Sequence, residues 1–215
     1  MSVYVVTDPP AVAGIYRTWD EVPRGVPGLR FHKVESEARA RAVLRGERVL
    51  LAPGRYAFTD GEGDWGGIGV VFVEQPPAGA PTVREISTHV FAVFPTAGIP
   101  SLASRPAIER ALNEIRNVLS ELGALYVALR ESPEGAALIV VHDYEGIGAW
   151  MEQRWKIKNS IVRDVIAACR GVIERRRLTV TYRRQPGHAA ADFDRYAFYN
   201  RRADELASAA VGRRA

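Results

Sequence analysis

Short runs of hydrophobic residues follow one another closely in the first part of the chain and predict strands. The runs Val3–Val6, Gly14–Tyr16 and Leu29–Val34 have the length and the β-branched and aromatic content typical of strands. Ser36 is a suitable N-cap for a helix that continues through Leu44. A module of about forty residues is marginal for independent stability, so we expect it to depend on a partner or a ligand.

The remainder of the chain alternates between strands and helices. Apolar runs predict five strands, over Tyr56–Asp60, Gly66–Glu74, Val83–Phe94, Ala136–His142 and Leu178–Arg183. Ser104 is the expected N-cap of a helix whose apolar face, at helical spacing, consists of Ile108, Leu112, Ile115, Leu119 and Leu122. Further helices are expected over Gly148–Trp155, over Ile161–Ile173 and at the end of the chain as far as Val211. This order predicts a mixed α/β domain around one central sheet.

Glycine and proline separate the two parts. The segments Arg45-Gly46-Glu47-Arg48 and Pro53-Gly54 lie between the last helix of the first part and the first strand of the second. We therefore predict an N-terminal module over residues 1–45, a linker over residues 46–54 and a second domain over residues 55–215.

Composition is that of a folded globular protein. The chain has 215 residues, of which 47% are hydrophobic and 25% charged, which excludes wholesale disorder and collagen-like structure. Its longest apolar runs, such as Ala136–Val141, are far too short to cross a membrane. The first four residues contain neither a basic nor a long apolar segment, so we expect no secretory signal. Cys169 is the only cysteine, which excludes a disulfide framework and a cysteine-ligated zinc site and favours a cytoplasmic location.

Positive charge is concentrated in one stretch. The net charge of the whole chain is +4, yet the stretch from Met151 to Gly187 contains ten basic and three acidic residues and so carries +7. A polyanionic partner would explain this concentration. A solvated helix face would explain it equally well, and charge alone does not separate the two.

Two acidic residues mark a candidate metal site. Asp60 and Asp143 each come at the C-terminal end of a predicted strand, at the edge where sites collect in open α/β sheets. If the two strands are neighbours, the carboxylates converge, and ionising both is costly unless a divalent cation compensates their charge. Mg²⁺ prefers such oxygen ligands. For either residue alone, a turn or helix cap is the commoner role.

Two more acids could complete such a site, and a histidine could assist its chemistry. Asp204 flanks the apolar stripe of the last helix. The earlier helix offers Glu109, Glu114 and Glu121, and we favour Glu114 because its helical neighbours place it at the margin of the apolar face. His188 lies in a predicted loop and could carry protons near neutral pH. A surface histidine in a turn is an equally good interpretation.

Several motifs, taken in order, resemble those of type 1 ribonuclease H. In the second domain they are Thr59-Asp60-Gly61, Asp143-Tyr144-Glu145-Gly146-Ile147, Trp155-Lys156, Gly187-His188 and Asn200 through Ala207. The N-terminal module is similar to the hybrid-binding module of eukaryotic ribonuclease H and of caulimovirus viroplasmin, through Tyr4, Gly14-Ile15-Tyr16, Thr18-Trp19 and Arg30-Phe31-His32-Lys33.

The resemblance implies a fold, an activity and a set of metal ligands. The fold would be a ribonuclease H-like mixed five-stranded sheet with flanking helices, preceded by a small three-stranded β plus helix module. The activity would be endonucleolytic cleavage of the RNA strand of RNA–DNA hybrids to 5′-phosphate and 3′-hydroxyl products. By matching positions, Asp60, Glu114, Asp143 and Asp204 would hold two Mg²⁺ ions, with Mn²⁺ as an alternative, and His188 would assist turnover. Two such ions clamp the scissile phosphate, lower the pKa of the attacking water and stabilise the departing oxygen.

Hybrid recognition requires reading 2′-hydroxyls on one strand and deoxyribose on the other. Aromatic side chains would lie against sugars and bases, and lysines would lie near phosphates; a role in the core of the module is the alternative for its aromatic residues. We expect a monomer that binds an RNA–DNA hybrid or double-stranded RNA and does not bind membranes. The expected nucleic-acid contacts are Tyr16, Trp19, Phe31 and Lys33 in the module and Trp155, Lys156 and Lys158 in the second domain.

Departures from the family pattern leave other functions open. The segment after Asp60 is Gly61-Glu62-Gly63-Asp64-Trp65 instead of the family's usual Gly-Ser, and no clean Ala-Gly-Glu pattern precedes Asp143. One alternative is a non-catalytic protein with a decayed site that binds RNA–DNA hybrids or double-stranded RNA. Another is a nuclease of the same fold that acts on a DNA junction or on single strands.

Overall fold

The structure is a computed structural model that describes residues 3–34, 36–63, 65–185 and 193–212. The chain divides into two compact units: Met1–Leu51 with Pro186–Arg201, and Ala52–Gln185 with Arg202–Ala215. The first unit therefore includes a C-terminal stretch that the sequence-based boundaries assign to the second domain. The backbone supplies the reason, because Val49 and Asp194 form an isolated parallel β-bridge.

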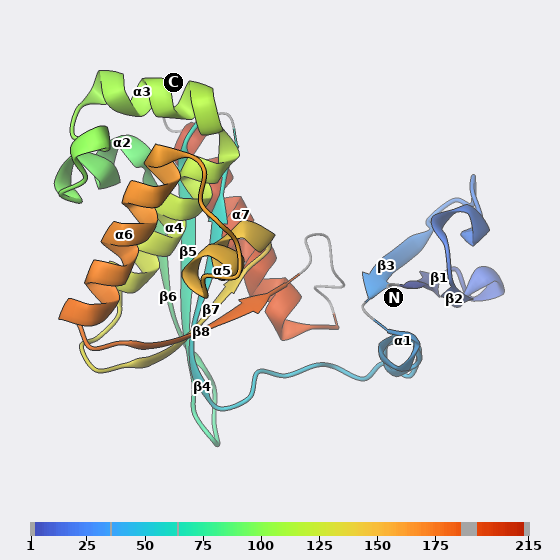
Figure 1. Ribbon diagram of the computed structural model, residues 1–215. Coiled ribbons are helices and arrows are strands. Elements are labelled where there is room, and N and C mark those ends of the chain that lie inside the picture. The colour runs from blue at the N-terminus through green and yellow to red at the C-terminus, as the bar shows by residue number, and fades with distance from the viewer. Residues whose placement is uncertain (1–2, 35, 64, 186–192, 213–215) are drawn as a thin grey trace. The chain divides into compact units, whose positions relative to one another are not determined.

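The first unit contains a three-stranded antiparallel sheet and a helix (Figure 1). Strand β1 (Val3–Asp8) lies between β2 (Gly14–Tyr16) and β3 (Arg30–Val34), with the short helices η1 (Pro10–Val12) and η2 (Trp19–Glu21) in the connections. Helix α1 (Glu37–Leu44) begins after Ser36, whose hydroxyl accepts the backbone N–H of Arg39, as predicted. The core of the unit is small and consists of Val3, Val5, Val34, Ala40 and Val43.

The second unit is built on a mixed five-stranded sheet in the order β6-β5-β4-β7-β8. Antiparallel pairing joins the first three strands in sequence, and parallel pairing joins β7 to β4 and β8 to β7. The strands are β4 (Gly54–Gly61), β5 (Gly67–Gln75), β6 (Thr82–His89), β7 (Ala137–His142) and β8 (Thr179–Arg184). The predicted five-stranded α/β architecture with flanking helices is thus confirmed.

Helices cover both faces of this sheet (Figure 1). Helices α4 (Asn117–Glu131) and α6 (Ser160–Arg175) pack on one face, and α7 (Arg195–Gly212) lies on the other. The remaining helices are α2 (Val90–Val93), η3 (Phe94–Thr96), η4 (Pro100–Leu102), α3 (Arg105–Ile115) and α5 (Glu145–Met151). Within the described ranges, no helix is both long enough and apolar enough to span a bilayer.

Three predicted elements differ from the observed ones. The strand predicted as far as Phe94 ends at His89, which pairs with Gly67, the first residue of β5, so no partner continues the ladder. The helix predicted over Gly148–Trp155 is observed over Glu145–Met151, so it begins and ends earlier. The single helix predicted from Ser104 through Leu122 is two helices, because Arg116 adopts a φ of 42° between α3 and α4.

Candidate active site

Asp60 and Asp143 come to the same edge of the sheet because their strands are parallel neighbours. Strands β4 and β7 pair with Tyr56 opposite Ile139 and Phe58 opposite Val141. The same register, continued by two residues, places Asp60 level with Asp143, which directly follows β7. The carboxyl ends of parallel strands therefore deliver both side chains to one place, as the sequence predicts.

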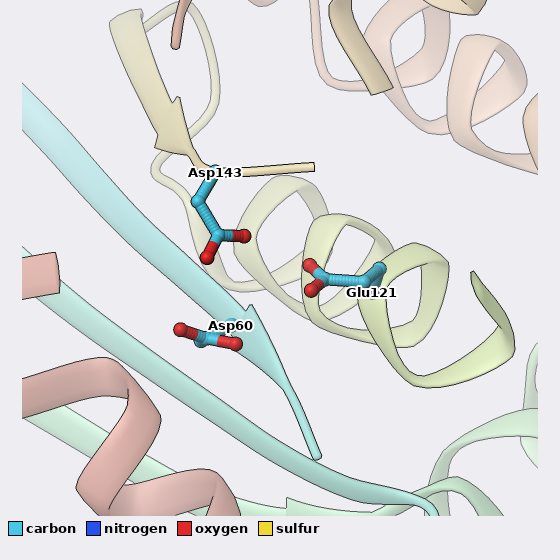
Figure 2. A group of neighbouring side chains, drawn as sticks. All are labelled: Asp60, Glu121 and Asp143. Atoms are coloured by element: carbon cyan, nitrogen blue, oxygen red, sulfur yellow. The ribbon is translucent and has the colours of Figure 1, made fainter. Parts of the chain in front are cut away.

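Glu121 of α4 supplies a third carboxylate. Helix α4 can approach β4 this closely because residue 61 is glycine: a Cβ there would overlap the backbone of Ser120 and Glu121. One oxygen from each of Asp60, Glu121 and Asp143 lies within 4.8 Å of the other two. Figure 2 shows the three side chains pointing toward one another from two strand ends and a helix. Three elements distant in sequence thus form one acidic cluster.

Asp204 approaches this cluster from the other face of the sheet, on α7. Helix α7 packs directly on β5, since a Cβ at Gly69 would overlap the backbone of Ala203 and one at Gly67 the carbonyl of Ala207. Asp60 pairs with Gly69, so its side chain leaves the sheet on the face that α7 covers. Asp204 is exposed, but its charge acts on the carboxyl group of Asp60.

Burial and mutual repulsion make the cluster costly to ionise. Asp60 and Glu121 are only 7% and 5% exposed. Burial, followed by the charges of Asp143 and Asp204, raises the pKa of Asp60 to about 8, although the backbone N–H of Gly61 opposes the shift. Burial, followed by the charges of Asp60 and Asp143, raises the pKa of Glu121 well above its ordinary value.

The donor set fits a divalent cation. The buried Oε2 of Glu121 has no hydrogen-bond partner among the described residues. Carboxylate oxygens from the buried Asp60 and Glu121 and the half-buried Asp143, all within 4.8 Å of one another, are hard, anionic ligands of the kind that Mg²⁺ and Mn²⁺ prefer. A bound cation would also remove the repulsion that raises these pKa values.

The choice of Glu114 as the helix carboxylate needs correction, because the structure brings Glu121 to the aspartates instead. Glu114 is exposed on α3, where its Oε1 accepts a hydrogen bond of 2.6 Å from the Nδ2 of Asn159. The choice assumed one continuous apolar face, and the break at Arg116 ends that face before Glu121. Glu109 is also elsewhere, in an ion pair of 2.9 Å with Arg105.

The surroundings of Glu121 in the folded chain distinguish it from the other two glutamates. Every residue from Leu119 to Leu129 is buried, so α4 is enclosed on all sides. Glu121 is the only charged residue in that stretch. Burying an ionisable residue is expensive unless it is functional or paired, so the burial of Glu121 favours it over an exposed acid such as Glu114.

His142 supports the turn that carries Asp143. Its Nδ1 lies 2.9 Å from the carbonyl oxygen of Tyr144, and because a carbonyl only accepts, Nδ1 carries the hydrogen. Burial lowers the pKa of His142 to about 4, so the ring is neutral at neutral pH. Nothing in the sequence indicates this role, since His142 is the last residue of an apolar strand.

Two of the aromatic residues expected to contact nucleic acid in the first unit, Trp19 and Phe31, are exposed and form a row with Tyr4. Trp19 and Phe31 are 42% and 41% exposed, so the alternative of a core role does not hold for them. Ring centroids lie 5.4 Å apart between Tyr4 and Trp19 and 4.7 Å apart between Trp19 and Phe31. The Nζ of Lys33 lies 5.9 Å from the centre of the Tyr4 ring. This face offers stacking surface beside a positive charge.

The other expected residues have mixed positions. Tyr16 is half-buried, and its hydroxyl donates a hydrogen bond of 2.8 Å to the carbonyl of Val12. Trp155 is 45% exposed. Lys156 and Lys158 are exposed in the same segment between α5 and α6. His188 lies outside the described residues.

Comparisons with known proteins give structural matches only. No family model matches the sequence, and no curated protein matches it. Ribonuclease H1 of the halophilic archaeon Halobacterium salinarum NRC-1 is 16% identical, with a TM-score of 0.48 over 74% of this chain and 98% of that chain. LC11 ribonuclease H1, isolated from compost by a metagenomic approach and solved in complex with an RNA/DNA hybrid, is 18% identical, with a TM-score of 0.46 over 74% of this chain and 96% of that chain.

An N-terminal ribonuclease H domain from Mycobacterium tuberculosis, solved as a fusion with maltose-binding protein, is 17% identical, with a TM-score of 0.45 over 75% of this chain and 96% of that chain. The fold itself is established by the observed strand order and helix placement. The second unit of this chain has the ribonuclease H-like fold that its motifs led us to expect.

Proposed function

We propose that this protein is an endonuclease that hydrolyses the RNA strand of RNA–DNA hybrids with the help of divalent cations. The observation that carries the proposal is the convergence of Asp60, Glu121 and Asp143 within 4.8 Å at one edge of the sheet. The hybrid substrate and the 5′-phosphate and 3′-hydroxyl products follow from the resemblance of the motifs to type 1 ribonuclease H.

Four carboxylates would hold the cations: Asp60, Glu121, Asp143 and Asp204. When bound, two Mg²⁺ ions, or Mn²⁺ in their place, would lower the pKa of the attacking water and stabilise charge on the departing oxygen. Metal ligands must be deprotonated, so Asp60, whose pKa is raised to about 8, would have to give up a proton to hold a cation. His142 holds the turn after β7 and thereby the position of Asp143.

Nucleic-acid contacts in the proposal involve both units. Trp19 and Phe31 would stack on bases or sugars, with Tyr16 beside them and Lys33 near phosphate. In the second unit, Trp155, Lys156 and Lys158 would follow the phosphates of the DNA strand. His188 would assist turnover by carrying a proton.

The main reason to expect a decayed, non-catalytic site no longer applies. This alternative was motivated by the unusual sequence around Asp60 and by the poor match at the glutamate position. Glu121 occupies the place that Glu114 does not reach, so three carboxylates are present together. Glu62, one of the unusual acids, accepts the backbone N–H of Trp65 at 3.1 Å and has a role in closing the turn.

A cleavage assay with a matched variant tests the proposal. We expect the purified chain to cut a labelled RNA–DNA hybrid in Mg²⁺ and to leave double-stranded DNA intact. Asp143→Asn should abolish cleavage while retaining hybrid binding, because it removes a cation ligand. Asp164→Asn, on α6, makes the same chemical change outside the cluster and should leave cleavage unchanged. Full activity of Asp143→Asn would refute the assigned site, and a wild-type chain inactive in both Mg²⁺ and Mn²⁺ would refute the function.

A further inference from the structure

A basic pocket lies within the first unit, separate from the aromatic row on its sheet. Its volume is about 260 Å³. The lining comes from two segments distant in sequence, the residues after α1 and the beginning of α7, and consists of Arg48, Val49, Phe193, Asp194, Arg195, Phe198 and Arg201.

Backbone hydrogen bonds hold the two segments together. The N–H of Val49 donates to the carbonyl of Phe193 at 2.8 Å, and the N–H of Arg195 donates to the carbonyl of Val49 at 3.0 Å. Arg39 of α1 adds a third bond, since its Nη2 donates to the carbonyl of Phe193 at 2.6 Å. These three hydrogen bonds fix the two segments of the lining relative to each other and to α1.

The charges in the pocket favour an anion. Arg48, Arg195 and Arg201 are exposed there against a single acid, Asp194. The Oδ1 of Asp194 accepts the backbone N–H of Tyr196 at 2.8 Å, so this carboxylate caps the start of α7. In the part of the chain that the structure describes, neither Arg48 nor Arg195 has an ion pair with a carboxylate.

The apolar part of the lining narrows the chemistry of the anion. Phe193, Phe198 and Val49 line the same cavity, and the guanidinium of Arg195 lies 5.2 Å from the centre of the Phe198 ring. A backbone phosphate with its attached sugar presents a charge next to an apolar surface. The planar guanidinium group of an arginine can donate two parallel hydrogen bonds to two oxygens of one phosphate.

We propose that this pocket binds a backbone phosphate of the nucleic-acid duplex that the first unit engages. The proposal rests on the proposed function, because the duplex is the RNA–DNA hybrid. It adds a contact that the motifs do not indicate, made by residues after α1 together with the start of α7. The C-terminal segment is then part of the binding surface of the N-terminal module.

Salt dependence of hybrid binding tests this contact. Affinity of the full chain for a labelled hybrid is measured by fluorescence anisotropy in EDTA, so that no cleavage occurs, over a range of KCl concentrations. Each phosphate contact contributes about 0.9 to the slope of log affinity against log salt. Arg48→Ala and Arg195→Ala should each reduce the slope by about 1 and weaken binding about eightfold at about 0.1 M salt, with little change near 1 M.

Matched control variants distinguish a specific phosphate contact in the pocket from a general effect of losing positive charge. Arg175→Ala removes one exposed arginine from the end of α6, in the second unit, and should leave the slope unchanged. Arg195→Lys keeps the charge and should retain most of the slope. An unchanged slope in both pocket variants, or an equal loss in Arg175→Ala, would overturn the proposal.

The two proposals fail in different ways. A wild-type chain that binds the hybrid through the pocket but never cleaves it contradicts the proposed nuclease function and leaves the phosphate contact standing. A chain that cleaves the hybrid while the pocket variants bind like wild type contradicts the phosphate contact alone. A wild-type chain that does not bind the hybrid in EDTA also overturns the contact.

Discussion

Replacing Asp60 by asparagine should stabilise the metal-free protein, and the gain should grow with pH. In the folded state the pKa of Asp60 is raised from 3.8 to about 8, chiefly by burial and then by neighbouring carboxylates. Between these two values the folded state binds more protons than the unfolded state. Stability therefore falls as pH rises through this window and levels off above the folded pKa.

The size of the effect follows from the two pKa values. Each pH unit well inside the window lowers the free energy of unfolding by about 1.4 kcal/mol, and the slope weakens near pH 8, where Asp60 is half ionised. Between pH 6 and pH 8 the loss from this group is about 2 kcal/mol. Asp60→Asn removes it, because asparagine does not ionise.

Chemical denaturation in EDTA at pH 6, 7 and 8 measures the difference. The advantage of Asp60→Asn over wild type should increase by about 2 kcal/mol across this range. Glu174→Gln, an exposed acid on α6, is the control and should show no such trend. Saturating Mg²⁺ should remove the pH trend of wild type, since a cation bound to the folded state stabilises it and favours ionised ligands. A wild-type chain whose stability in EDTA is flat from pH 6 to pH 8 would refute the argument.

Two further predictions concern the parts of the fold that position the cluster. Glu121→Gln should reduce hybrid cleavage by at least about a hundredfold, as expected for a ligand within the metal site. Glu114→Gln should retain nearly full activity. Equal losses of the two variants in a steady-state cleavage assay would contradict the assignment of Glu121. Gly69→Ala should destabilise the fold by more than about 2 kcal/mol in thermal or chemical unfolding, because the added methyl meets the backbone of α7. Gly171→Ala in α6 meets only the end of the Arg175 side chain and should stabilise by up to about 1 kcal/mol. The reverse order of stabilities would show that the approach of α7 to β5 does not need glycine.

The pattern of neighbouring residues was sufficient to predict features that depend only on a few consecutive positions. Strand-length apolar runs and turn residues located the strands of both units, because side-chain alternation and backbone preferences act over a few residues. Ser36 capped its helix as predicted. Asp60 and Asp143 could be proposed as partners because each ends a strand, and parallel strands end at the same edge.

The choice among the three glutamates was beyond the reach of local pattern. Arg116 is neither glycine nor proline, so nothing in its identity marks the positive φ that divides α3 from α4. The apolar face predicted from Ile108 to Leu122 therefore does not lie on one continuous helix axis. Glu121 joins the aspartates only because α4 lies against β4 at Gly61, and that approach depends on the packing of the whole helix on the sheet.

The sequence by itself determined most of the strands and helices, their order along the chain and two of the acidic residues, since these depend on periodicity and on where a strand stops. Tertiary structure alone decided which glutamate completes the cluster and that the start of α7 belongs with the N-terminal unit. Both depend on contacts between residues far apart in the chain, such as Gly61 with Glu121 and Val49 with Asp194, and no local propensity encodes such contacts.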